Sequence, residues 1–289
     1  MRPAWRRRTD IAPPSLRIQR AFSSMRDLLR DIRRLLEHER DVYGPLLPLN
    51  APSDPSPSNA DDDMANFDLF GNQVDPAEDP SLPPWERIAA LIPDDAPYKD
   101  AETLEEVEAF LANNVLIPLD ESRKNPVFGV GDPEADLMII GEAPGRNEDE
   151  QGEPFVGRAG QLLDKILAAI DLSRDAVYIT NILKSRPPRN RDPKTEEVKA
   201  HLPILYKQLE LIRPKIILCV GKVAGNTLLD RRSSLKRLRK TEHEFYGVPV
   251  LVTYHPAALL RNPNWKRPTW EDVKLLRTRY DELRAAADA

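Results

Sequence analysis

The sequence predicts an α/β protein, a three-layer αβα sandwich with a mainly parallel, four-stranded central sheet. Four short apolar runs have the length and composition of buried strands. Segments with helical spacing lie between these runs, and loops containing Gly, Pro or Asn connect the two kinds of segment. Strands that alternate with helices predict βαβ units, in which helices cover both faces of a parallel sheet.

The elements can be assigned in chain order. A first helix, TLEEVEAFLANN, has Thr103 as a cap. The strands are the runs at 137–140 (LMII), 177–181 (VYITN), 212–221 (IRPKIILCVG) and 248–256 (VPVLVTYHP). Helices are expected at 159–170, 194–212 and 222–229, and a closing helix at 270–287.

The chain divides into four parts by composition. Residues 1–15 form a basic tail expected to be disordered, and residues 16–44 form an amphipathic helix with an Arg-rich face. That helix either contacts DNA or a protein, or packs on the main domain. Residues 45–100 are rich in Pro and Asp and are expected to be a linker, with a short piece at 85–92 that could dock as a helical turn. Residues 101–289 form the main domain.

Composition excludes some classes of protein. The net charge of −5 gives no indication of nucleic-acid binding for the chain as a whole. One cysteine, Cys219, lies in an apolar run, so we expect a core residue and no internal disulfide. No apolar run approaches the roughly 20 residues that cross a bilayer, and the basic start is not followed by the apolar part of a secretion signal. We expect a cytoplasmic monomer with no membrane partner.

The loop that follows the first predicted strand carries the most chemical information. It reads GEAPGRNEDEQGEPFVGRAG and contains the carboxylates Glu142, Glu148 and Asp149 together with the aromatic Phe155. Open α/β sheets bind ligands at the carboxyl ends of their strands. Carboxylates beside one aromatic ring indicate chemistry on a ligand with a flat face.

Two later stretches, VYITNILKSRPPRNRDP and TYHPAALLRNP, also follow predicted strands. Taken together and in this order, the three stretches resemble the motifs of the uracil-DNA glycosylase superfamily in its family 4 form. The resemblance covers about residues 113–280. It implies a uracil-DNA glycosylase-like fold and a monofunctional enzyme of base excision repair. Such an enzyme acts on uracil-containing DNA, flips deoxyuridine out, hydrolyses its N-glycosidic bond and leaves an abasic site.

The resemblance also implies roles for individual residues. Phe155 is the platform on which the base stacks, and Asn181 reads its edge through a paired hydrogen bond. His255 donates to uracil O2 as negative charge develops. Glu142 and Glu148 are both candidates for the carboxylate that stabilises the electron-poor sugar or orients water, and the sequence does not rank them. Further pocket positions are Gly141, Ala143 and Asp149.

Residues that contact DNA follow the second and fourth strands. Arg186, Arg189, Arg191 and Arg261 are expected to hold phosphates, which positions DNA without reading its sequence. Either Leu259 or Leu260 is expected to fill the space that the flipped base leaves.

The sequence departs from the family in one respect. Family 4 members usually hold a four-iron, four-sulfur cluster on four cysteines, and the corresponding positions here are Asn114, Ile117, Ser185 and His201. Such clusters need thiolate ligands, and isoleucine cannot bind iron. We therefore expect no cofactor, with Ile117 buried and Ser185 hydrogen-bonded in place of the cluster.

Two alternative functions stay open at this point. A non-catalytic DNA-binding relative could have lost activity together with the cluster. A protein of the same fold could instead act on a nucleotide or another small molecule. A pure DNA-binding protein needs none of the pocket residues, whereas a small-molecule enzyme needs neither the arginines nor the HPAALLRNP loop.

Overall fold

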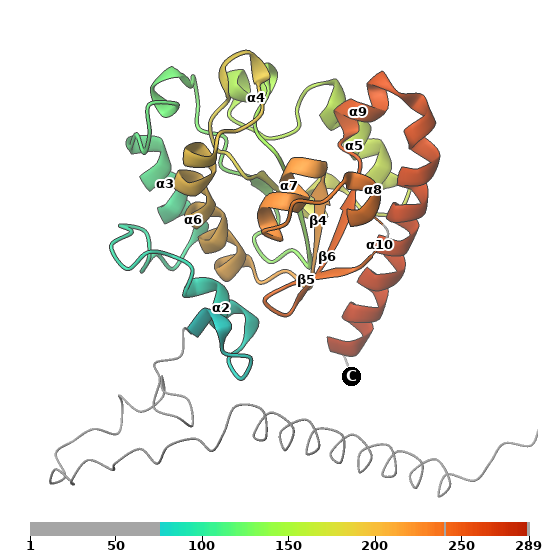
Figure 1. The fold of residues 1–289 in the computed structure, drawn as a ribbon, viewed down its shortest axis with the longest axis horizontal. Helices are drawn as coiled ribbons and strands as arrows, with labels where there is room; N and C mark the ends of the chain where they lie inside the picture. Colours follow the sequence, from blue (N-terminus) through green and yellow to red (C-terminus); the bar gives the residue numbers. More distant parts are fainter. Residues whose placement is uncertain (1–75, 240, 288–289) are drawn as a thin grey trace, which may run out of the picture. The chain divides into compact units, whose positions relative to one another are not determined.

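In the computed structural model, which describes residues 76–239 and 241–287, the chain folds around one six-stranded sheet (Figure 1). The strand order is β1-β3-β2-β4-β6-β5. The four central strands, β3, β2, β4 and β6, are parallel, which confirms the predicted core of the sheet. Their bounds are Leu137–Gly141 for β2, Tyr178–Asn181 for β3, Ile216–Val220 for β4 and Val248–Thr253 for β6.

Two antiparallel edge strands complete the sheet and were not predicted. They are β1 (Val130–Gly131), which pairs with β3, and β5 (His243–Phe245), which pairs with β6. With two and three residues, neither is long enough to show the alternation of apolar and polar residues that identifies a strand.

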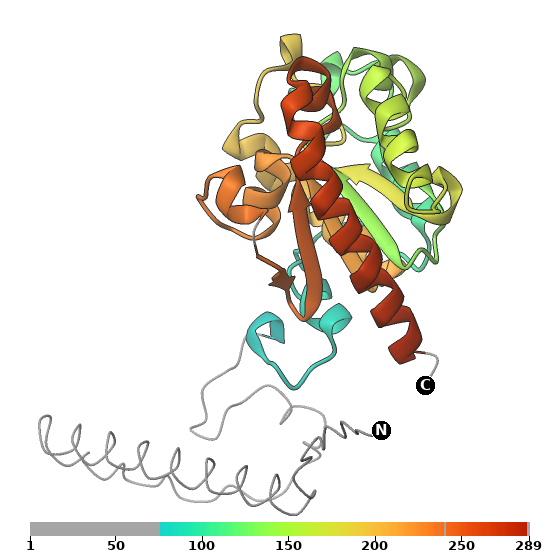
Figure 2. The same ribbon diagram turned by 90° about the vertical axis from the view of Figure 1, so that its right-hand side faces the viewer.

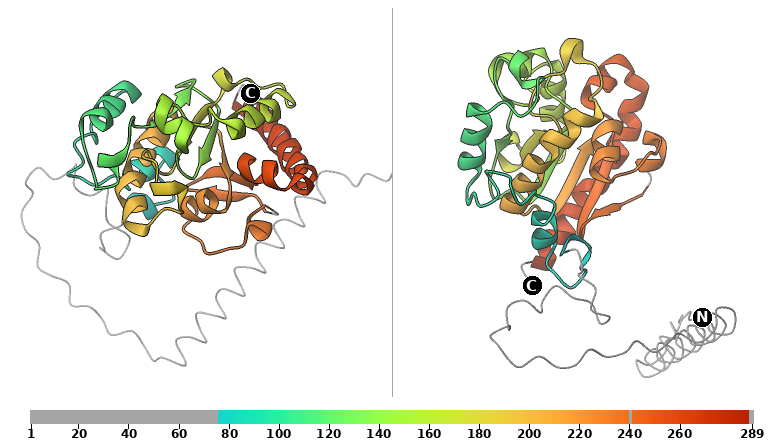
Figure 3. Two further views of the ribbon diagram at one scale, coloured as in Figure 1. Left: turned by 90° about the horizontal axis from the view of Figure 1, so that it is seen from above. Right: turned by 60° about the vertical axis from the view of Figure 1, so that its left-hand side comes forward.

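Helices cover both faces of the sheet because successive side chains of a buried strand point to opposite faces. Met138 and Ile140 of β2 pack in one apolar cluster with residues of α6 (Thr195–Ile212), α7 (Lys222–Leu228) and α8 (Leu235–Leu238). Leu137 and Ile139 pack in a second cluster with α5 (Arg158–Ala168) and α10 (Lys266–Ala287). Figure 2 shows α10 running across its face of the sheet, and Figure 3 shows the helices on the two sides. The predicted three layers are confirmed.

The first predicted helix is α3 (Leu104–Asn113), and its cap forms as expected. Thr103 Oγ1 accepts a hydrogen bond from the backbone N–H of Glu106, and the Glu106 carboxylate accepts one from the backbone N–H of Thr103. This capping box fixes where the helix begins. Val107 and Leu111 are fully buried on its inner face.

Part of the expected linker, residues 76–100, packs onto the domain, and the helical turn allowed at 85–92 is among the parts that dock. This stretch contains the short helices η2 (Pro76–Glu78) and α2 (Pro84–Ala89), and α2 contacts α6. Ile88, Ile92 and Tyr98 are buried in the hydrophobic core. The expected tail at 1–15, the amphipathic helix at 16–44 and the linker residues 45–75 lie outside the described residues.

The remaining short elements follow strands or precede helices, and most carry site residues. The helix α8 was not predicted, and α10 begins four residues earlier than expected. No helix in the described part of the chain has the length and apolarity to span a membrane. The short elements are η3 (Asp120–Ser122), α4 (Arg146–Gln151), η4 (Arg174–Ala176), η5 (Pro188–Asn190), α9 (Pro256–Arg261) and η6 (Pro263–Trp265).

Replacing Ile88 by Ala tests whether α2 belongs to the folded unit. The Ile88 side chain is fully buried, so its truncation is expected to lower the free energy of unfolding by about 2–5 kcal/mol. Urea unfolding measures this difference. Glu86→Ala, an exposed change on the same helix, serves as the control and is expected to stay within about 0.5 kcal/mol of the unchanged chain. An equally small loss of unfolding free energy for both variants would show that residues 76–100 are a linker.

Candidate active site

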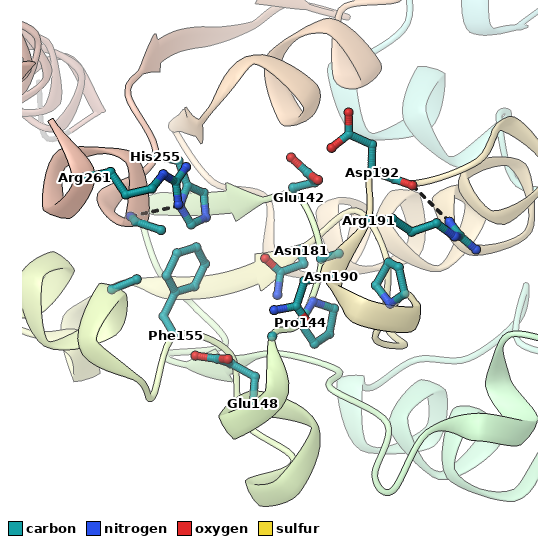
Figure 4. Close-up of a pocket in the computed structure, with 15 residues that line it drawn as sticks. Glu142, Pro144, Glu148, Phe155, Asn181, Asn190, Arg191, Asp192, His255 and Arg261 are labelled. Carbon is teal, nitrogen blue, oxygen red and sulfur yellow. Dashed lines mark hydrogen bonds between the residues drawn. The ribbon is translucent and has the colours of Figure 1, made fainter.

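The loops that follow β2, β3 and β6 surround a cavity of about 360 Å³ at the carboxyl ends of the parallel strands (Figure 4). Eight of the residues singled out from the sequence line it, from three stretches far apart in the chain. They are Glu142, Ala143, Glu148, Phe155, Asn181, Arg191, His255 and Arg261. The sequence analysis missed other lining residues, among them Pro144, Pro187, Asn190 and Asp192.

Phe155 projects into the cavity from a strained stretch of backbone. Its φ of 56° lies in the left-handed region, which is rarely adopted by bulky residues and marks functional sites. Its ring centroid lies 5.4 Å from that of His255, with 28° between the ring planes. A flat group in the cavity can therefore contact the Phe155 ring while it reaches the imidazole.

Two glycines make room for Phe155. A Cβ on Gly160 would lie 1.6 Å from the Phe155 carbonyl oxygen, and a Cβ on Gly141 would lie 2.7 Å from Cζ of the Phe155 ring. The same Cβ on Gly141 would lie 2.2 Å from Oδ1 of Asn181. Gly141, expected in the pocket, therefore contributes by the absence of a side chain and does not line the cavity itself.

Glu148 holds the backbone that follows Phe155. Its Oε1 accepts hydrogen bonds from the N–H groups of Val156, at 3.1 Å, and Gly157, at 3.0 Å. From the other side, Arg174 donates to the carbonyl oxygens of Phe155, at 3.2 Å, and Pro154. One carboxylate and one guanidinium thus fix the loop before any ligand binds.

The Glu142 carboxylate, in contrast, makes no hydrogen bond with the side chains and backbone that the structure describes. Burial raises its pKa from 4.5 to about 7, and the nearby negative charge of Asp192 adds to the shift. Glu142 is therefore free to interact with a ligand or water, and near neutral pH it exchanges between its acid and its carboxylate.

His255 is held as a neutral hydrogen-bond donor. Its Nδ1 accepts a hydrogen bond from the backbone N–H of Ala257 at 3.1 Å, so the ring proton lies on Nε2. Burial lowers the His255 pKa from 6.5 to about 4, as does the positive charge of Arg261, against a smaller opposing effect of Glu148. At neutral pH the imidazole can donate from Nε2 without carrying charge.

Asn181, at the end of β3, presents an unused acceptor. The side chain is 2% exposed, and its Oδ1 is the one buried side-chain polar atom among the described residues without a hydrogen-bond partner. Leaving such an atom unpaired costs about 1–3 kcal/mol. Because Asn181 lines the cavity, a ligand that donates an N–H there would recover that energy.

A buried lysine, which the sequence analysis missed, supports Asn181 from behind. The Nζ of Lys184 donates to the backbone oxygen of Asn181 (2.8 Å), Thr180 Oγ1 (2.7 Å) and Gln208 Oε1 (2.6 Å). Burial lowers the pKa of Lys184 well below its ordinary value. The available signal was a lysine directly after the apolar pair IL in the run NILKS. A lysine buried there would need several hydrogen-bond acceptors.

The arginines expected to bind DNA lie on the rim of the cavity. Arg189 and Arg261 are exposed, whereas Arg186 is half-buried and donates from Nε to Asn190 Oδ1 at 2.7 Å. Arg191, also expected to hold phosphate, forms a two-point ion pair with the buried Glu197 of α6. That pairing makes Arg191 a support of the rim. Arg189 and Arg261, in contrast, have no ion-pair partner in the described residues.

Two expected site residues lie elsewhere. Asp149 is buried outside the cavity lining, where its Oδ1 accepts a hydrogen bond from the backbone N–H of Lys124. Leu259 is 1% exposed on the inner side of α9, so it cannot enter a DNA duplex. Leu260 is 39% exposed and stays the candidate for that role. The expected loop is a helix here, and helical geometry turns neighbouring side chains in different directions.

Comparison with known proteins identifies this arrangement. The model of the uracil DNA glycosylase superfamily matches residues 128–274, about half of the chain. The chain belongs to the uracil DNA glycosylase superfamily. It is 41% identical to the type-4 uracil-DNA glycosylase of Archaeoglobus fulgidus over 60% of this chain and 91% of that protein. It is 36% identical to the type-4 enzyme of Thermotoga maritima, over 61% of this chain and 94% of that protein. A type-5 uracil-DNA glycosylase of Pyrobaculum aerophilum matches at 36% over 57% of this chain.

The four positions matched above to the cluster cysteines of family 4 do not fit an iron–sulfur cluster. They carry an amide, an alkyl group, a hydroxyl and an imidazole, and the one cysteine of the chain, Cys219, is buried in β4. No group of three or more possible metal ligands occurs within the described ranges. Ser185 is buried and hydrogen-bonded as expected, Ile117 is half-buried, and Asn114 is exposed at the end of α3.

A buried carboxylate occupies the centre of this region instead. Asp120 accepts hydrogen bonds from Ser185 Oγ and from His201 Nε2, the latter at 3.1 Å, and Arg123 lies 3.4 Å away. Burial opposes ionisation, but the hydrogen bonds from His201 and Ser185 outweigh it and hold the pKa of Asp120 below its ordinary value. His201 Nδ1 accepts from the backbone N–H of Lys184, so the ring donates to Asp120 from Nε2. We call these four residues the Asp120 network.

Replacing Glu142 by Gln tests the raised pKa. Because the folded protein holds this proton more tightly than the unfolded chain, Glu142 costs stability as pH rises from about 4.5 to about 7. The Gln variant is therefore expected to gain stability relative to the unchanged chain across that interval and to keep the gain above it. Urea unfolding at several pH values measures the difference. Glu153→Gln removes an exposed carboxylate from the same loop and is the control. Parallel curves for Glu142→Gln and the unchanged chain would contradict the shift.

Proposed function

We propose that this protein is a uracil-DNA glycosylase that hydrolyses the N-glycosidic bond of flipped-out deoxyuridine in DNA, releases uracil and leaves an abasic site. The observation that carries the proposal is the unpaired, buried Oδ1 of Asn181, a residue that lines the cavity together with the Phe155 ring and the His255 donor. The similarity to type-4 uracil-DNA glycosylases supports it.

The Asn181 amide accounts for selection of uracil. Its oxygen accepts from uracil N3–H and its nitrogen donates to O4. Cytosine presents an acceptor at N3 and an amino donor at the fourth position. The amide oxygen would then face an acceptor and the amide nitrogen a donor, so neither hydrogen bond could form. Sites built on such hydrogen bonds discriminate strongly because the wrong ligand leaves buried groups unpaired. Lys184 restrains the backbone of Asn181, so the amide cannot easily move to accommodate the wrong base.

Bond cleavage uses groups on the other sides of the cavity. As the bond between N1 and C1′ breaks, negative charge builds on the uracil ring, and Nε2–H of His255 donates to O2. A preorganised donor of this kind contributes about 2.7–4 kcal/mol to catalysis. Uracil leaves as its N1 anion, and the sugar becomes electron-poor at C1′. A water oxygen bonds to that carbon and gives up a proton, which the Glu142 carboxylate or the uracil anion accepts.

The contacts of the two acidic residues support different roles for them. Glu142 has no competing hydrogen bond in the described structure, so its carboxylate stabilises the sugar cation or orients the water. Glu148 already accepts two backbone N–H groups, so it acts as a positioning residue for the Phe155 loop. This division ranks two candidates that the sequence left equal.

DNA lies across the rim of the cavity in this proposal. Arg189 and Arg261 are exposed and hold phosphates, with Arg186 and Asn190 shaping the segment between them. Leu260 enters the space that the flipped nucleotide leaves. Because the substrate is DNA, we also infer an intracellular location.

We infer further that the protein works without an iron–sulfur cluster. The cluster positions carry no thiol, and the Asp120 network occupies the space between the segment 114–123 and Ser185. Hydrogen bonds to one buried carboxylate take over the task of holding these two parts of the chain together.

Excision of uracil tests the function directly. The assay uses a labelled oligonucleotide with a single uracil, and alkali converts abasic sites to strand breaks. His255→Ala is expected to lower kcat by about 10²–10³-fold, and Asn181→Ala and Glu142→Gln by on the order of 10²-fold. Glu148→Gln is expected to lose at least about tenfold less than Glu142→Gln, because an amide oxygen still accepts the two backbone N–H groups.

Glu150→Gln is the matched control for these changes, since Glu150 is exposed on α4 and pairs with Arg146 and Lys124. Its rate should equal that of the unchanged protein. DNA binding without any excision by the unchanged protein would instead support a non-catalytic DNA-binding relative.

Iron analysis and one substitution test the cluster-free inference. Purified, active protein is expected to contain well under one iron atom per chain and to keep its activity after treatment with a chelator. Asp120→Asn is expected to lower the free energy of unfolding by about 3 kcal/mol, because it leaves buried donors without their charged acceptor. Glu121→Gln, an exposed neighbouring change, should have little effect. Iron at about four atoms per chain would overturn the inference.

A further inference from the structure

A stack of planar side chains stands beside the cavity, at the carboxyl end of β6. Tyr254 directly follows β6, and its ring lies 4.8 Å from the ring of Trp265, with only 12° between the planes. The guanidinium carbon of Arg239 lies 4.3 Å from the Tyr254 ring centroid. Trp265 ends η6, so three separate segments meet in this stack.

The inner end of the stack is fixed by ionic contacts. Arg239 forms a two-point ion pair with Asp272, at 2.7 and 3.0 Å, and donates to the backbone oxygen of Pro268 at 2.8 Å. Asp272 also accepts from Thr253 Oγ1 at 2.6 Å, which joins the pair to β6. Because its partners are held in this way, the Trp265 ring is presented in one orientation.

The outer part of Trp265 faces solvent among positive charges. The side chain is 37% exposed. Arg261, Lys266 and Arg267 in the same segment are exposed, and none of the three forms an ion pair with a described residue. Arg261 also lines the cavity. A rigid, exposed indole therefore lies within a few residues of the candidate active site, in a run of unpaired cations.

This combination fits one ligand best. Proteins that bind single-stranded nucleic acid combine cationic side chains along the backbone with aromatic rings on which bases stack. In an intact duplex both faces of every base are already covered by its neighbours, so only an unpaired base can stack on Trp265. The three free cations favour a phosphate backbone over an apolar protein segment.

We propose that Trp265 is a stacking platform for an unpaired base that neighbours the excised nucleotide, which adapts this site to single-stranded DNA. The proposal rests on the proposed function for the identity of the excised base. It adds a contact outside the uracil pocket and a preference between DNA forms.

A second tryptophan provides a matched control. The exposed large apolar side chains of the described chain are Val115, Leu260, Trp265, Trp270 and Leu275. Trp270, on α10, is 42% exposed, and its ring makes no aromatic stack with any described residue. It matches Trp265 in chemistry and exposure but is not held by neighbouring rings.

The experiment measures equilibrium binding of a labelled, uracil-free oligonucleotide, as a single strand and as a duplex. Trp265→Ala is expected to weaken single-strand binding about tenfold, within the range of one lost base stack, and duplex binding less than threefold. Trp265→Phe should recover most of the loss, and Trp270→Ala should bind both forms as the unchanged protein does. The salt dependence should stay the same for Trp265→Ala but decrease for Lys266→Ala with Arg267→Ala, since only the latter removes cations.

Single-strand binding by Trp265→Ala equal to that of the unchanged protein would overturn the proposal, as would equal losses on the two DNA forms. Thermal unfolding of each variant separates these results from a folding defect. Because the oligonucleotide contains no uracil, the result does not depend on catalysis. If the unchanged protein excises uracil and Trp265→Ala binds both DNA forms normally, only the stacking platform is contradicted. If the unchanged protein excises no uracil but Trp265→Ala selectively loses single-strand binding, only the glycosylase activity is contradicted.

Discussion

The carboxylate of Asp120 is the interaction on which the rim of the cavity depends. It is removed from water, and its charge is balanced entirely by donors from separate parts of the chain. A buried ion pair is weak evidence for added stability, but losing one partner is costly because the other is left uncompensated. The network therefore acts mainly on geometry. Its hydrogen-bond donors are Leu116 N–H, Ile117 N–H, Ser185 Oγ and His201 Nε2, and the Arg123 guanidinium forms an ion pair with it.

That geometry reaches the cavity through Ser185. The next residues along the chain, from Arg186 to Asp192, form the rim that carries Pro187, Asn190 and the cation Arg189. On the other side of Ser185, Lys184 restrains Asn181. Holding this one serine thus fixes the approach to the base from two directions. Polar contacts achieve this because every donor and acceptor in the network is paired.

Much of the fold could be predicted from local sequence. The run LMII of β2 is apolar on both faces, which identifies a central parallel strand, and Thr103 with Glu106 marks where α3 begins. The strands β1 and β5 could not be predicted, because pairing with a neighbouring strand, and not their own composition, makes them strands. Within residues 76–100 the sequence indicated only a possible docked turn at 85–92, because two buried isoleucines are diluted among many Pro and Asp residues.

The site was predictable in outline, since the motifs that follow parallel strands meet at one edge of the sheet. Its details depend on tertiary contacts. Nothing in the sequence distinguishes Leu259 from Leu260 before the start of α9 is known. Nor can Glu142 and Glu148 be ranked until it is clear which of them accepts the backbone N–H groups of the Phe155 loop.

The contact between Gly160 and the Phe155 carbonyl limits how this pocket could change during evolution. Any side chain at position 160 would collide with that carbonyl and move the aromatic ring, so the base platform cannot be adjusted in small steps. Asn181 meets Gly141 through its side-chain oxygen, an atom that a substitution at position 181 would itself replace. A descendant that excises a different base would therefore arise by changes in the groups that read the edge of the base, with its stacking surface inherited unaltered.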